Sequence, residues 1–384
     1  MSAAAGQLRV AHVYAHLEVG GIERSLVDLL PRLDRRRYEP RMICLRRRGL
    51  LAAELEAAGI PVQVCRCPSR LPVGWSARSL ARTLRDRGVD LVHAHAEHAA
   101  HCATEAARLA GVPLVVATFH TRPGFDPRGV ERERLQWMGR SANVYVSEAV
   151  RRDHLAGLSV NGNGGRSVVI RNGIDVDRFA AQPHPGRLAD LRRELRLQGA
   201  GPVLLNVARL QRIKAPDDLL KAFAQVRRRI PGAVLVMAGG GRREAEVLAH
   251  IRALGLGEAV RLCGTRADVE DLYHLADLHV MASRGEGFSL VVLEAMAAGL
   301  PQVLTAVGGT PEAIEASGAA RLVPPGDPAR LAQAIVALLE DETERRGMIE
   351  AARERARRFS IAEQVVRMER LYDSLASGKV ALAL

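Results

Sequence analysis

The sequence predicts an α/β protein made of two doubly wound domains, each built on a parallel sheet. Three observations support this fold class. Short apolar runs of strand length alternate with segments of helical spacing along most of the chain, which is typical of strand–helix–strand units. The alternation begins twice, at residue 8 and again at residue 203. The chain has 384 residues, which is more than one hydrophobic core usually accommodates.

The first half of the chain carries the first alternation. Strands are expected at residues 8–14, 42–45, 62–65, 91–93, 114–118, 144–147 and 168–170. Helical spacing fills intervals at 25–33, 51–58, 76–87 and 99–109. Such a rhythm places helices on both faces of the sheet, and ligands of these sheets gather at the carboxyl ends of the strands.

The second alternation fills the rest of the chain. Strands are expected at 203–207, 234–238, 260–264, 278–282 and 303–305, with a helix at 290–298. From Pro328 the sequence is helical to about Ser374, with one break near residues 359–360. The segment 180–186 contains Pro183 and Pro185 and is the best linker candidate. We therefore expect domains at 1–180 and 187–360, followed by a helical segment at 361–384.

Composition excludes several classes of protein. Hydrophobic residues make up 48% and charged residues 26%, as in soluble globular proteins. No apolar run reaches 18 residues and the first residues lack a secretory pattern, so we expect a cytoplasmic protein. The five cysteines show no zinc-binding spacing. Aromatic residues are only 3% and no nucleic-acid motif is present, so we expect no nucleic-acid partner.

The net charge of +12 is concentrated in the first half of the chain. Residues 1–178 hold 27 Lys and Arg against 18 Asp and Glu, with arginine triplets at 35–37 and 46–48. This excess fits an anionic membrane surface, with peripheral attachment at its inner face, or a phosphate-bearing acceptor. The alternative is a solvated arginine-rich surface, since the chain holds 52 Arg and only 3 Lys.

The helix predicted at 290–298 begins after a glycine turn. Ser289 is a natural N-cap whose hydroxyl is expected to accept a first-turn amide, and Gly299 and Pro301 mark the end of the helix. An N-terminus of this kind presents unpaired N–H groups and about half a positive charge. It therefore predicts a phosphate site. Its residues are Gly287, Phe288, Ser289 and Leu290.

Two glutamates flank this phosphate site, Glu286 in the turn and Glu294 just over one helical turn inside. Because a carboxylate repels a phosphate, each is better used as an acceptor for hydroxyl groups. A phosphate with hydroxyls on both sides describes a nucleotide sugar, in which Glu294 reaches the ribose and Glu286 the sugar being moved. The alternative is an ordinary surface helix whose glutamates are merely solvated.

The run Glu-Gly-Phe-Ser-Leu-Val-Val-Leu-Glu-Ala-Met-Ala at 286–297 resembles the Glu-x7-Glu signature of the family 4 retaining glycosyltransferases. The likeness covers nearly the whole chain, most specifically residues 203–327. It implies the GT-B fold, in which two Rossmann-like domains face each other across a cleft. The first domain would bind the acceptor and the second the nucleotide sugar, and the last helix would cross back to the first domain.

Basic residues after the strand at 203–207 also match this family. Arg209 and Lys214 occupy its Arg-Leu-x-x-x-Lys pattern, and a rigid guanidinium with a flexible ammonium can neutralise a pyrophosphate from two sides. Ala215 replaces the usual following glycine, and the triplet at 239–241 lacks the acidic residue that family members often carry. Arg266 lies near where family members hold the base.

A double glycine follows the first strand. Gly20 and Gly21 precede the helical run at 25–33, and a strand, a glycine turn and a helix start let backbone approach a phosphate. The run Gly-Gly-x-Glu-Arg resembles the family loop that faces the donor phosphates across the cleft. Taken by itself, the pair is more often a plain turn, and it is too short for a dinucleotide fingerprint.

Histidines cluster in the first half and raise the question of a metal site. His93 and His95 straddle a predicted strand end, and we expect them to point to opposite faces. His98 and His101 share a helix face but lie past the turn. Three convergent ligands are therefore not expected, and a strand-end pair that lines a cleft is the preferred interpretation.

His120 follows a buried strand in the run Thr-Phe-His-Thr. This context resembles the strand end that meets the donor sugar in lipid-directed mannosyltransferases and related enzymes. An isolated histidine is usually structural or a surface residue, but here a functional role is favoured. The residues expected on the acceptor side are His93, His95, Arg122 and Ser147.

The resemblance implies retaining transfer of a hexosyl unit from a UDP- or GDP-sugar to a hydroxyl of a saccharide or lipid-linked acceptor, in synthesis of cell-surface polysaccharide, lipopolysaccharide or glycolipid. His120, Glu286, Arg209 and Lys214 are the expected catalytic residues. No metal or cofactor is expected, because cationic groups and the helix end already cover the diphosphate. Two alternatives stay open: a nucleotide-sugar 2-epimerase on the same scaffold, and a non-catalytic, nucleotide-responsive, membrane-associated protein.

Overall fold

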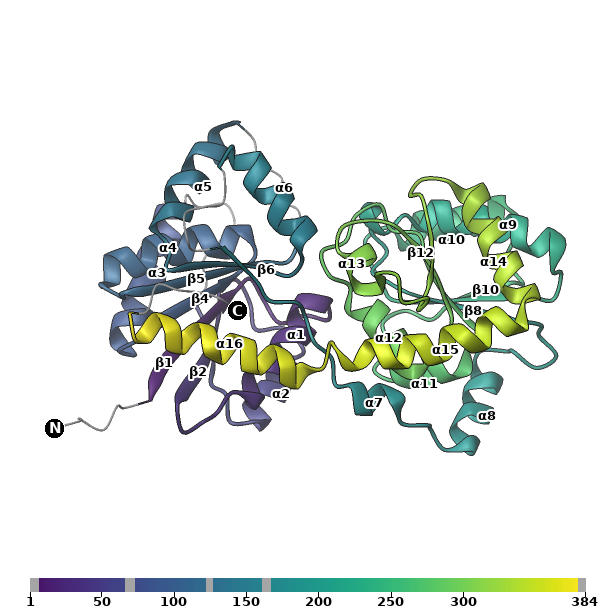
Figure 1. Ribbon diagram of the computed structural model, residues 1–384, viewed down its shortest axis with the longest axis horizontal. Coiled ribbons are helices and arrows are strands. Elements are labelled where there is room, and N and C mark those ends of the chain that lie inside the picture. The colour runs from purple at the N-terminus through teal and green to yellow at the C-terminus, as the bar shows by residue number, and fades with distance from the viewer. Residues whose placement is uncertain (1–6, 66–72, 122–126, 161–166, 379–384) are drawn as a thin grey trace. The chain divides into compact units, whose positions relative to one another are not determined.

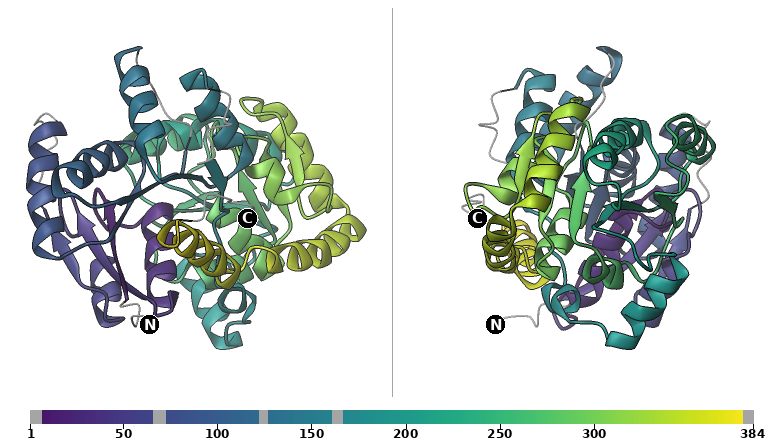
Figure 2. Two further views of the ribbon diagram at one scale, coloured as in Figure 1. Left: turned by 60° about the vertical axis from the view of Figure 1, so that its left-hand side comes forward. Right: turned by 90° about the vertical axis from the view of Figure 1, so that its right-hand side faces the viewer.

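The computed structural model describes residues 7–65, 73–121, 127–160 and 167–378. The chain divides into two compact units, the first formed by Met1–Gly173 with Ile361–Leu384 and the second by Ile174–Ser360. Each unit contains one sheet whose paired strands are all parallel. Helices cover both faces of each sheet (Figures 1 and 2). The predicted α/β fold class is confirmed.

The first unit has a seven-stranded sheet in the order β3-β2-β1-β4-β5-β6-β7. The strands are β1 Leu8–Tyr14, β2 Tyr38–Cys44, β3 Val62–Val64, β4 Leu91–His95, β5 Leu114–Phe119, β6 Ala142–Tyr145 and β7 Ser167–Val169. The helices are α1 Gly21–Leu29, η1 Leu30–Arg32, α2 Ala52–Ala57, α3 Val73–Asp86, α4 Glu97–Ala110, α5 Pro127–Gly139, α6 Glu148–Leu158 and α16 Ile361–Ala376. The strand order changes direction between β1 and β4.

One face of this sheet packs against α1, α2 and α16. Val10, Leu91 and Val116 of the sheet join the apolar side chains of these helices in one buried core. The helix α16 follows the second unit in sequence, yet it brings Leu371 and Tyr372 into this core, both fully buried. Figure 1 shows α16 in yellow beside the strands of the first unit. The C-terminal helix is therefore an integral part of the first unit.

The second unit has a six-stranded sheet in the order β10-β9-β8-β11-β12-β13. The strands are β8 Val203–Val207, β9 Val234–Ala238, β10 Val260–Leu262, β11 Leu278–Met281, β12 Gln302–Thr305 and β13 Arg321–Val323. The helices are α7 Val176–Ala180, α8 Pro185–Glu194, η2 Arg212–Lys214, α9 Pro216–Arg229, α10 Glu244–Ala253, α11 Val269–Leu275, α12 Leu290–Ala298, α13 Thr310–Ile314, α14 Pro328–Glu340 and α15 Glu342–Arg357. Here the order changes direction between β8 and β11.

The division between the units falls at residues 173 and 174, earlier than the expected domain end at 180. The helix α7 belongs to the second unit because Phe179 is 8% exposed and packs edge-on against Tyr273, with ring centroids 6.1 Å apart. The proline-containing segment 180–186 therefore connects α7 to α8 inside the second unit and does not separate two domains.

The long helical region near the C-terminus has two breaks, where the sequence predicted one. The expected break near residues 359–360 separates α15 from α16. A second break occurs at Asp341, whose backbone is extended and whose carboxylate accepts the amide of Glu344, 2.8 Å away. This N-cap starts α15 and was not recognised in the sequence. Within the described residues, no helix combines the length and the apolar content needed to cross a membrane.

Candidate functional site

The predicted donor-site residues of the second unit come together at the point where its strand order reverses. Arg209 and Lys214 follow β8, and Glu286 follows β11. These two strands are neighbours in the sheet, so the loops at their carboxyl ends lie side by side. In open α/β sheets ligands bind at this kind of position, because the two loops diverge and leave a crevice between them.

Lys214 and Glu286 form an ion pair there. The Lys214 Nζ lies 2.7 Å from Oε1 and 2.8 Å from Oε2 of Glu286, and the two side chains are 22% and 6% exposed. The sequence assigned them to different ligands, Lys214 to the diphosphate and Glu286 to the sugar. In the structure each neutralises the other, so the Glu286 charge does not stand uncompensated beside the predicted phosphate site.

The other two predicted cationic residues differ in their availability. Arg209 is exposed, and within the described part of the chain its guanidinium makes no hydrogen bond or ion pair. Arg266 is held by Asp268, at 2.7 Å, and by Glu194, at 2.6 Å. The pKa of Arg266 is raised by these hydrogen-bonded carboxylates. Arg209 is thus free for an anionic ligand, whereas Arg266 already donates most of its N–H groups to Asp268 and Glu194.

The helix α12 has the predicted bounds, Leu290–Ala298, and Gly299 ends it in the left-handed conformation with φ 74°. The predicted hydroxyl cap is wrong. Ser289 stands at the N-cap position, but its Oγ makes no capping hydrogen bond and points toward the Met281 Sδ, 4.0 Å away. The first-turn amides therefore keep their donor capacity. Phe288 and Ser289 are 3% and 7% exposed, so it is the backbone of this turn that can serve a ligand.

Glu294 is fixed by a residue that the sequence did not single out. The hydroxyl of Tyr273 donates to its Oε2 across 2.7 Å, and both side chains are buried. Burial and the charge of Glu294 raise the pKa of Tyr273, which keeps the hydroxyl protonated as a donor. Tyr273 lies on α11 and has no distinguishing sequence context. Only the packing of α11 against α12 reveals its role.

Two glycine loops shape the backbone around this site. Gly308 has φ +52°, and a Cβ there would overlap the carbonyl oxygen of Glu286. Gly309 donates its amide to the Gly287 carbonyl across 2.8 Å. Gly239 has φ +134°, and a Cβ there would overlap the Ala208 carbonyl, directly before Arg209. The glycine triplet at residues 239–241 therefore allows its loop to pack closely against the Arg209 segment.

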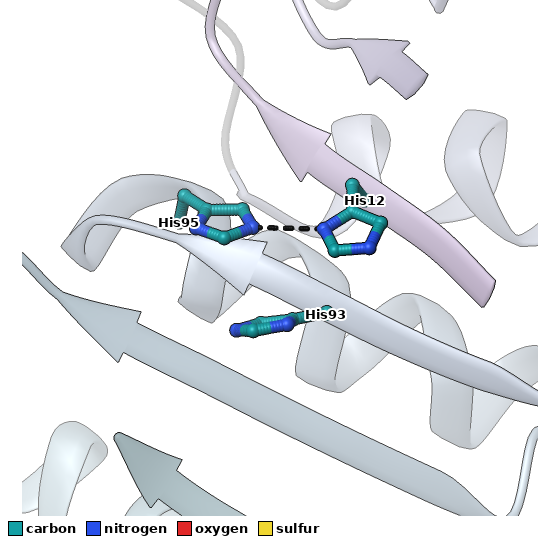
Figure 3. A group of neighbouring side chains, drawn as sticks. All are labelled: His12, His93 and His95. Carbon is teal, nitrogen blue, oxygen red and sulfur yellow. Dashed lines mark hydrogen bonds between the residues drawn. The ribbon is translucent and has the colours of Figure 1, made fainter. Parts of the chain in front are cut away.

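In the first unit, the reversal point between β1 and β4 holds a cluster of histidines. His12 pairs in register with His93, and His95 ends β4 (Figure 3). The rings of His93 and His95 are stacked, with centroids 4.3 Å apart. The expectation that these two residues point to opposite faces is wrong. The strand continues through His95, and residues two apart in a strand share a face.

The cluster is connected by hydrogen bonds. His12 Nδ1 lies 3.1 Å from His95 Nε2, and His95 Nδ1 lies 3.3 Å from His120 Nε2. The ring of His93 is bonded separately, through Nδ1 to the Tyr372 hydroxyl and through Nε2 to the Thr118 hydroxyl, each at 2.6 Å. Burial lowers the pKa of His12 to about 3 and that of His120 to about 4, so both rings are neutral near pH 7.

Ring nitrogens of His12, His93 and His95 lie within 4.8 Å of one another, which raises the question of a metal ion. The ring geometry does not suit one. The lone pairs of an imidazole lie in its plane, so the stacked rings of His93 and His95 cannot direct theirs to one point. In addition, both nitrogens of His93 are already bonded. We therefore interpret the group as a hydrogen-bonded cluster.

The residues predicted on the acceptor side do not form an open surface. His93 and His95 are 0% and 2% exposed, and Ser147 is fully buried, where its hydroxyl caps α6 by accepting the Val150 amide. These three residues therefore cannot contact an acceptor directly. Arg122 lies outside the described residues. His120, at 9% exposed, is the member of the histidine chain that reaches furthest toward solvent.

The predicted phosphate-facing turn before α1 is occupied by a carboxylate. Gly20 is the N-cap of α1 in an extended conformation, and a Cβ there would collide with the carboxylate of Glu23. Glu23 is 2% exposed and lies 3.5 Å from Nδ1 of His16. Gly21 is exposed and has open space around its Cα. Of the two glycines, Gly21 offers the backbone that a ligand could approach.

Family models match both parts of the chain. Residues 19–178 match the model described as Glycosyltransferase Family 4, and residues 189–355 match that of Glycosyl transferases group 1. The D-inositol 3-phosphate glycosyltransferase 1 of Catenulispora acidiphila is 32% identical over 75% of this chain and 73% of its own. The GDP-mannose-dependent alpha-(1-6)-phosphatidylinositol monomannoside mannosyltransferase of Mycobacterium tuberculosis is 30% identical over 87% of this chain and 89% of its own.

Solved structures share the fold at lower identity. Anabaena HepE in complex with UDP and glucose aligns with a TM-score of 0.85 at 23% identity, covering 96% of this chain and all (100%) of its own. A glycosyltransferase from Rickettsia africae aligns with a TM-score of 0.84 at 22% identity, covering 98% of this chain and 100% of its own. The architecture common to these structures is the GT-B fold, as the sequence predicted.

Proposed function

The chain belongs to glycosyltransferase family 4, and we propose that it transfers a hexosyl unit from a nucleoside diphosphate sugar to a hydroxyl acceptor with retention of configuration. One observation carries the proposal. Two glutamates flank the uncapped N-terminus of α12, and each is held by its own partner, Glu286 by Lys214 and Glu294 by Tyr273. Acids fixed on both sides of a phosphate-binding helix end match the two sugar moieties of a nucleotide sugar.

The diphosphate binds to the amides at the start of α12, with Arg209 and Lys214 supplying positive charge. Lys214 has three N–H donors, so it can keep Glu286 and still donate to a phosphate oxygen. Glu294 accepts from a ribose hydroxyl and Glu286 from a hydroxyl of the transferred sugar. In this arrangement Arg266 would lie on the base side of the nucleotide, as the family resemblance implies.

The chemical step separates the sugar from the departing diphosphate. Negative charge grows on the leaving phosphate while the sugar becomes oxocarbenium-like, and the helix end, Arg209 and Lys214 stabilise that charge. No carboxylate of the motif is placed as an obvious nucleophile, so the leaving phosphate takes the proton of the incoming hydroxyl on the same face. The cationic groups of the chain serve the diphosphate without a metal ion.

The relatives suggest the class of donor and acceptor. One relative is named for GDP-mannose and phosphatidylinositol monomannoside, another for D-inositol 3-phosphate, and a structural neighbour holds UDP and glucose. We extend these to a UDP- or GDP-hexose as donor and to a saccharide or a lipid-linked or phosphate-bearing polyol as acceptor. Such a product would enter a cell-surface polysaccharide or glycolipid.

Attachment to an anionic membrane through the arginine triplets at 35–37 and 46–48 is part of the proposal. Four arginines of the two triplets are each paired with a carboxylate, namely Arg36 with Asp34, Arg37 with Glu369, Arg47 with Glu18 and Arg48 with Glu56. The positive charge available to an anionic membrane is therefore smaller than the number of arginines suggests. Sedimentation with anionic liposomes tests this, and binding should fall as salt rises. Binding that is absent or insensitive to salt would favour the solvated-surface alternative.

A donor panel followed by product analysis tests the central proposal. Calorimetry with UDP, GDP and ADP identifies the base. Glu294→Ala should weaken binding of the preferred nucleotide by about tenfold to a hundredfold, because hydrogen bonds to charged groups contribute about 1.5–3 kcal/mol. Incubation with donor and acceptors should yield a glycosylated product. Conversion of the donor sugar without an acceptor would indicate an epimerase, and binding without any turnover a non-catalytic protein. Unchanged nucleotide affinity in Glu294→Ala would remove the ribose role.

A further inference from the structure

The three histidines His12, His95 and His120 form a continuous hydrogen-bonded chain across the first unit. It starts on β1, crosses the end of β4 and finishes immediately after β5. A neutral imidazole carries one N–H and one lone pair, so each ring can donate to one neighbour and accept from the other. The chain therefore has only two consistent proton orders, and each order fixes the tautomer of all three rings.

The inner end of the chain distinguishes the two orders. Nε2 of His12 is buried and has no hydrogen-bond partner, and the ring is fully buried. In the inward order each N–H points toward His12, and His12 Nε2 would then carry an N–H with nothing to accept it. In the outward order each N–H points toward His120, and His12 Nε2 carries only a lone pair. Buried N–H groups without a partner are rarer in proteins than acceptors that remain unsatisfied, so the outward order is favoured.

We propose that His12 and His95 are positioning residues that hold His120 in the tautomer with its proton on Nδ1. His12 Nδ1–H donates to His95 Nε2, and His95 Nδ1–H donates to His120 Nε2. The lone pair of His120 Nε2 is then occupied, and its Nδ1–H is left as a hydrogen-bond donor. This tautomer assignment rests only on the hydrogen bonds among His12, His95 and His120. Only its consequence for transfer rests on the proposed function.

The consequence is that His120 acts on the substrate as a neutral donor and not as a general base. Its Nδ1–H would donate to a hydroxyl oxygen of a substrate bound to the first unit. The low pKa of His120, which burial brings to about 4, is in agreement with a ring that accepts no proton near neutral pH. Removal of the acceptor proton then remains with the leaving phosphate.

The neighbouring histidine provides the contrast. His93 stacks on His95 but lies outside the chain, because its nitrogens bond Tyr372 and Thr118. Tyr372→Phe removes one buried hydrogen bond of the same cluster and leaves the His12–His95–His120 chain intact. It is the matched control for any effect that comes only from disturbing a buried polar group.

The tautomer can be read directly in the wild-type protein, without any variant. Long-range proton–nitrogen correlation spectra of protein labelled with ¹⁵N-histidine distinguish a protonated ring nitrogen from one that carries a lone pair. The His120 signals can be identified because they are missing from the spectrum of His120→Ala, and they should show the proton on Nδ1. A proton on Nε2 of His120 would overturn the proposal. So would one equivalent of zinc retained after dialysis, since metal ligation would displace the hydrogen bonds.

Variants at His95 test the effect on transfer. His95→Leu removes the donor to His120, and we expect the His120 proton to move to Nε2 and kcat to fall by about tenfold to a hundredfold, with nucleotide affinity and the donor KM within about twofold of wild type. His95→Asn keeps an N–H near the place of Nδ1 and should restore part of the rate. Tyr372→Phe should keep both the tautomer and kcat.

Two results separate the possible failures. If His95→Leu keeps the Nδ1 proton on His120, or if Tyr372→Phe lowers kcat as much as His95→Leu does, the positioning role is wrong. If the tautomer is as assigned but no acceptor is glycosylated under any condition, the proposed function fails and the hydrogen-bonded chain stands.

Discussion

At the scale of single residues, the acids of the second unit depend on partners far away in the sequence. Glu286 pairs with Lys214, 72 residues before it, and Glu294 accepts from Tyr273, 21 residues before it. Both carboxylates are largely shielded from water, with the Glu286 side chain 6% and Glu294 8% exposed. An acid that is desolvated must be held by a donor or a cation, so each partner fixes the position of a ligand contact.

Tyr273→Phe should weaken nucleotide binding by about five- to tenfold, because Glu294 loses a hydrogen bond worth about 1–1.5 kcal/mol and is then less well oriented toward the ribose. Isothermal titration with the preferred nucleoside diphosphate measures the change. Tyr372→Phe, which removes a similarly buried hydroxyl from the first unit, is the control and should bind nucleotide normally. Equal affinity in Tyr273→Phe and wild type would show that Glu294 is positioned by other contacts.

Glu286→Gln should lower transfer by at least about tenfold while binding of the free nucleoside diphosphate stays equal or becomes tighter. The reason is electrostatic, since the substitution removes a negative charge next to the phosphate site and releases Lys214 from its 2.7 Å ion pair. Lys214→Met should do the opposite to affinity and weaken diphosphate binding. Calorimetry together with initial rates checks both. A loss of nucleotide affinity in Glu286→Gln would place that carboxylate on the nucleotide and not on the transferred sugar.

At the scale of elements, the site depends on α12 and on the glycine loops that pack beside its N-terminus. Eight of the nine residues of α12 are buried, so this is an interior helix that can hardly shift. The loop after β12 approaches the turn so closely that Gly308 leaves no room for a side chain next to Glu286. The position of Glu286 is therefore set by backbone packing as well as by Lys214.

Gly308→Ala should destabilise the second unit by more than the strain of its backbone conformation alone. Alanine at φ +52° costs about 1–2 kcal/mol, and displacement of the Glu286 carbonyl adds about 1–3 kcal/mol. Gly318→Ala is the matched control, because φ there is +75° but nothing lies within 4 Å of a new Cβ. Urea unfolding of both variants isolates the packing contribution. Equal losses would mean that the loop can move away from Glu286.

At the scale of the whole molecule, both sheets bury neutral histidines. His12 in the first unit and His279 in the second are fully buried, and burial lowers their pKa values to about 3 and about 4. In the unfolded chain these groups titrate near 6.5. Between these values the unfolded state binds more protons than the folded state, so stability must fall as pH decreases from 7 toward 4.

His279→Gln should reduce this pH dependence. At pH 5 a single histidine with a folded pKa of about 4 accounts for roughly 2 kcal/mol of lost stability. The difference in unfolding free energy between pH 7 and pH 5 should shrink by about that amount in the variant, although the variant is less stable at pH 7 because His279 bonds Gln302. An unchanged difference in His279→Gln would contradict a neutral buried ring.

The sequence alone determined the features that depend on neighbouring residues. The bounds of α12, its left-handed end at Gly299 and the spacing of Glu286 and Glu294 follow from local propensities and a short motif, and so does the alternation that gives two parallel sheets. Local patterns failed where a side chain had a choice of partner. Ser289 was expected to cap α12 with its hydroxyl. His93 and His95 were expected to point to opposite faces because the predicted strand ended at His93, two residues before β4 ends.

Only the tertiary structure decided which distant groups meet. Sheet order brings β1 beside β4 and β8 beside β11, and it thereby joins His12 to His95, 83 residues apart, and Lys214 to Glu286. Packing of α11 on α12 selects Tyr273 as the partner of Glu294. These contacts could not be derived from spacing, because a hydrogen bond or ion pair across a sheet depends on strand order and register, which arise from the burial of the whole core.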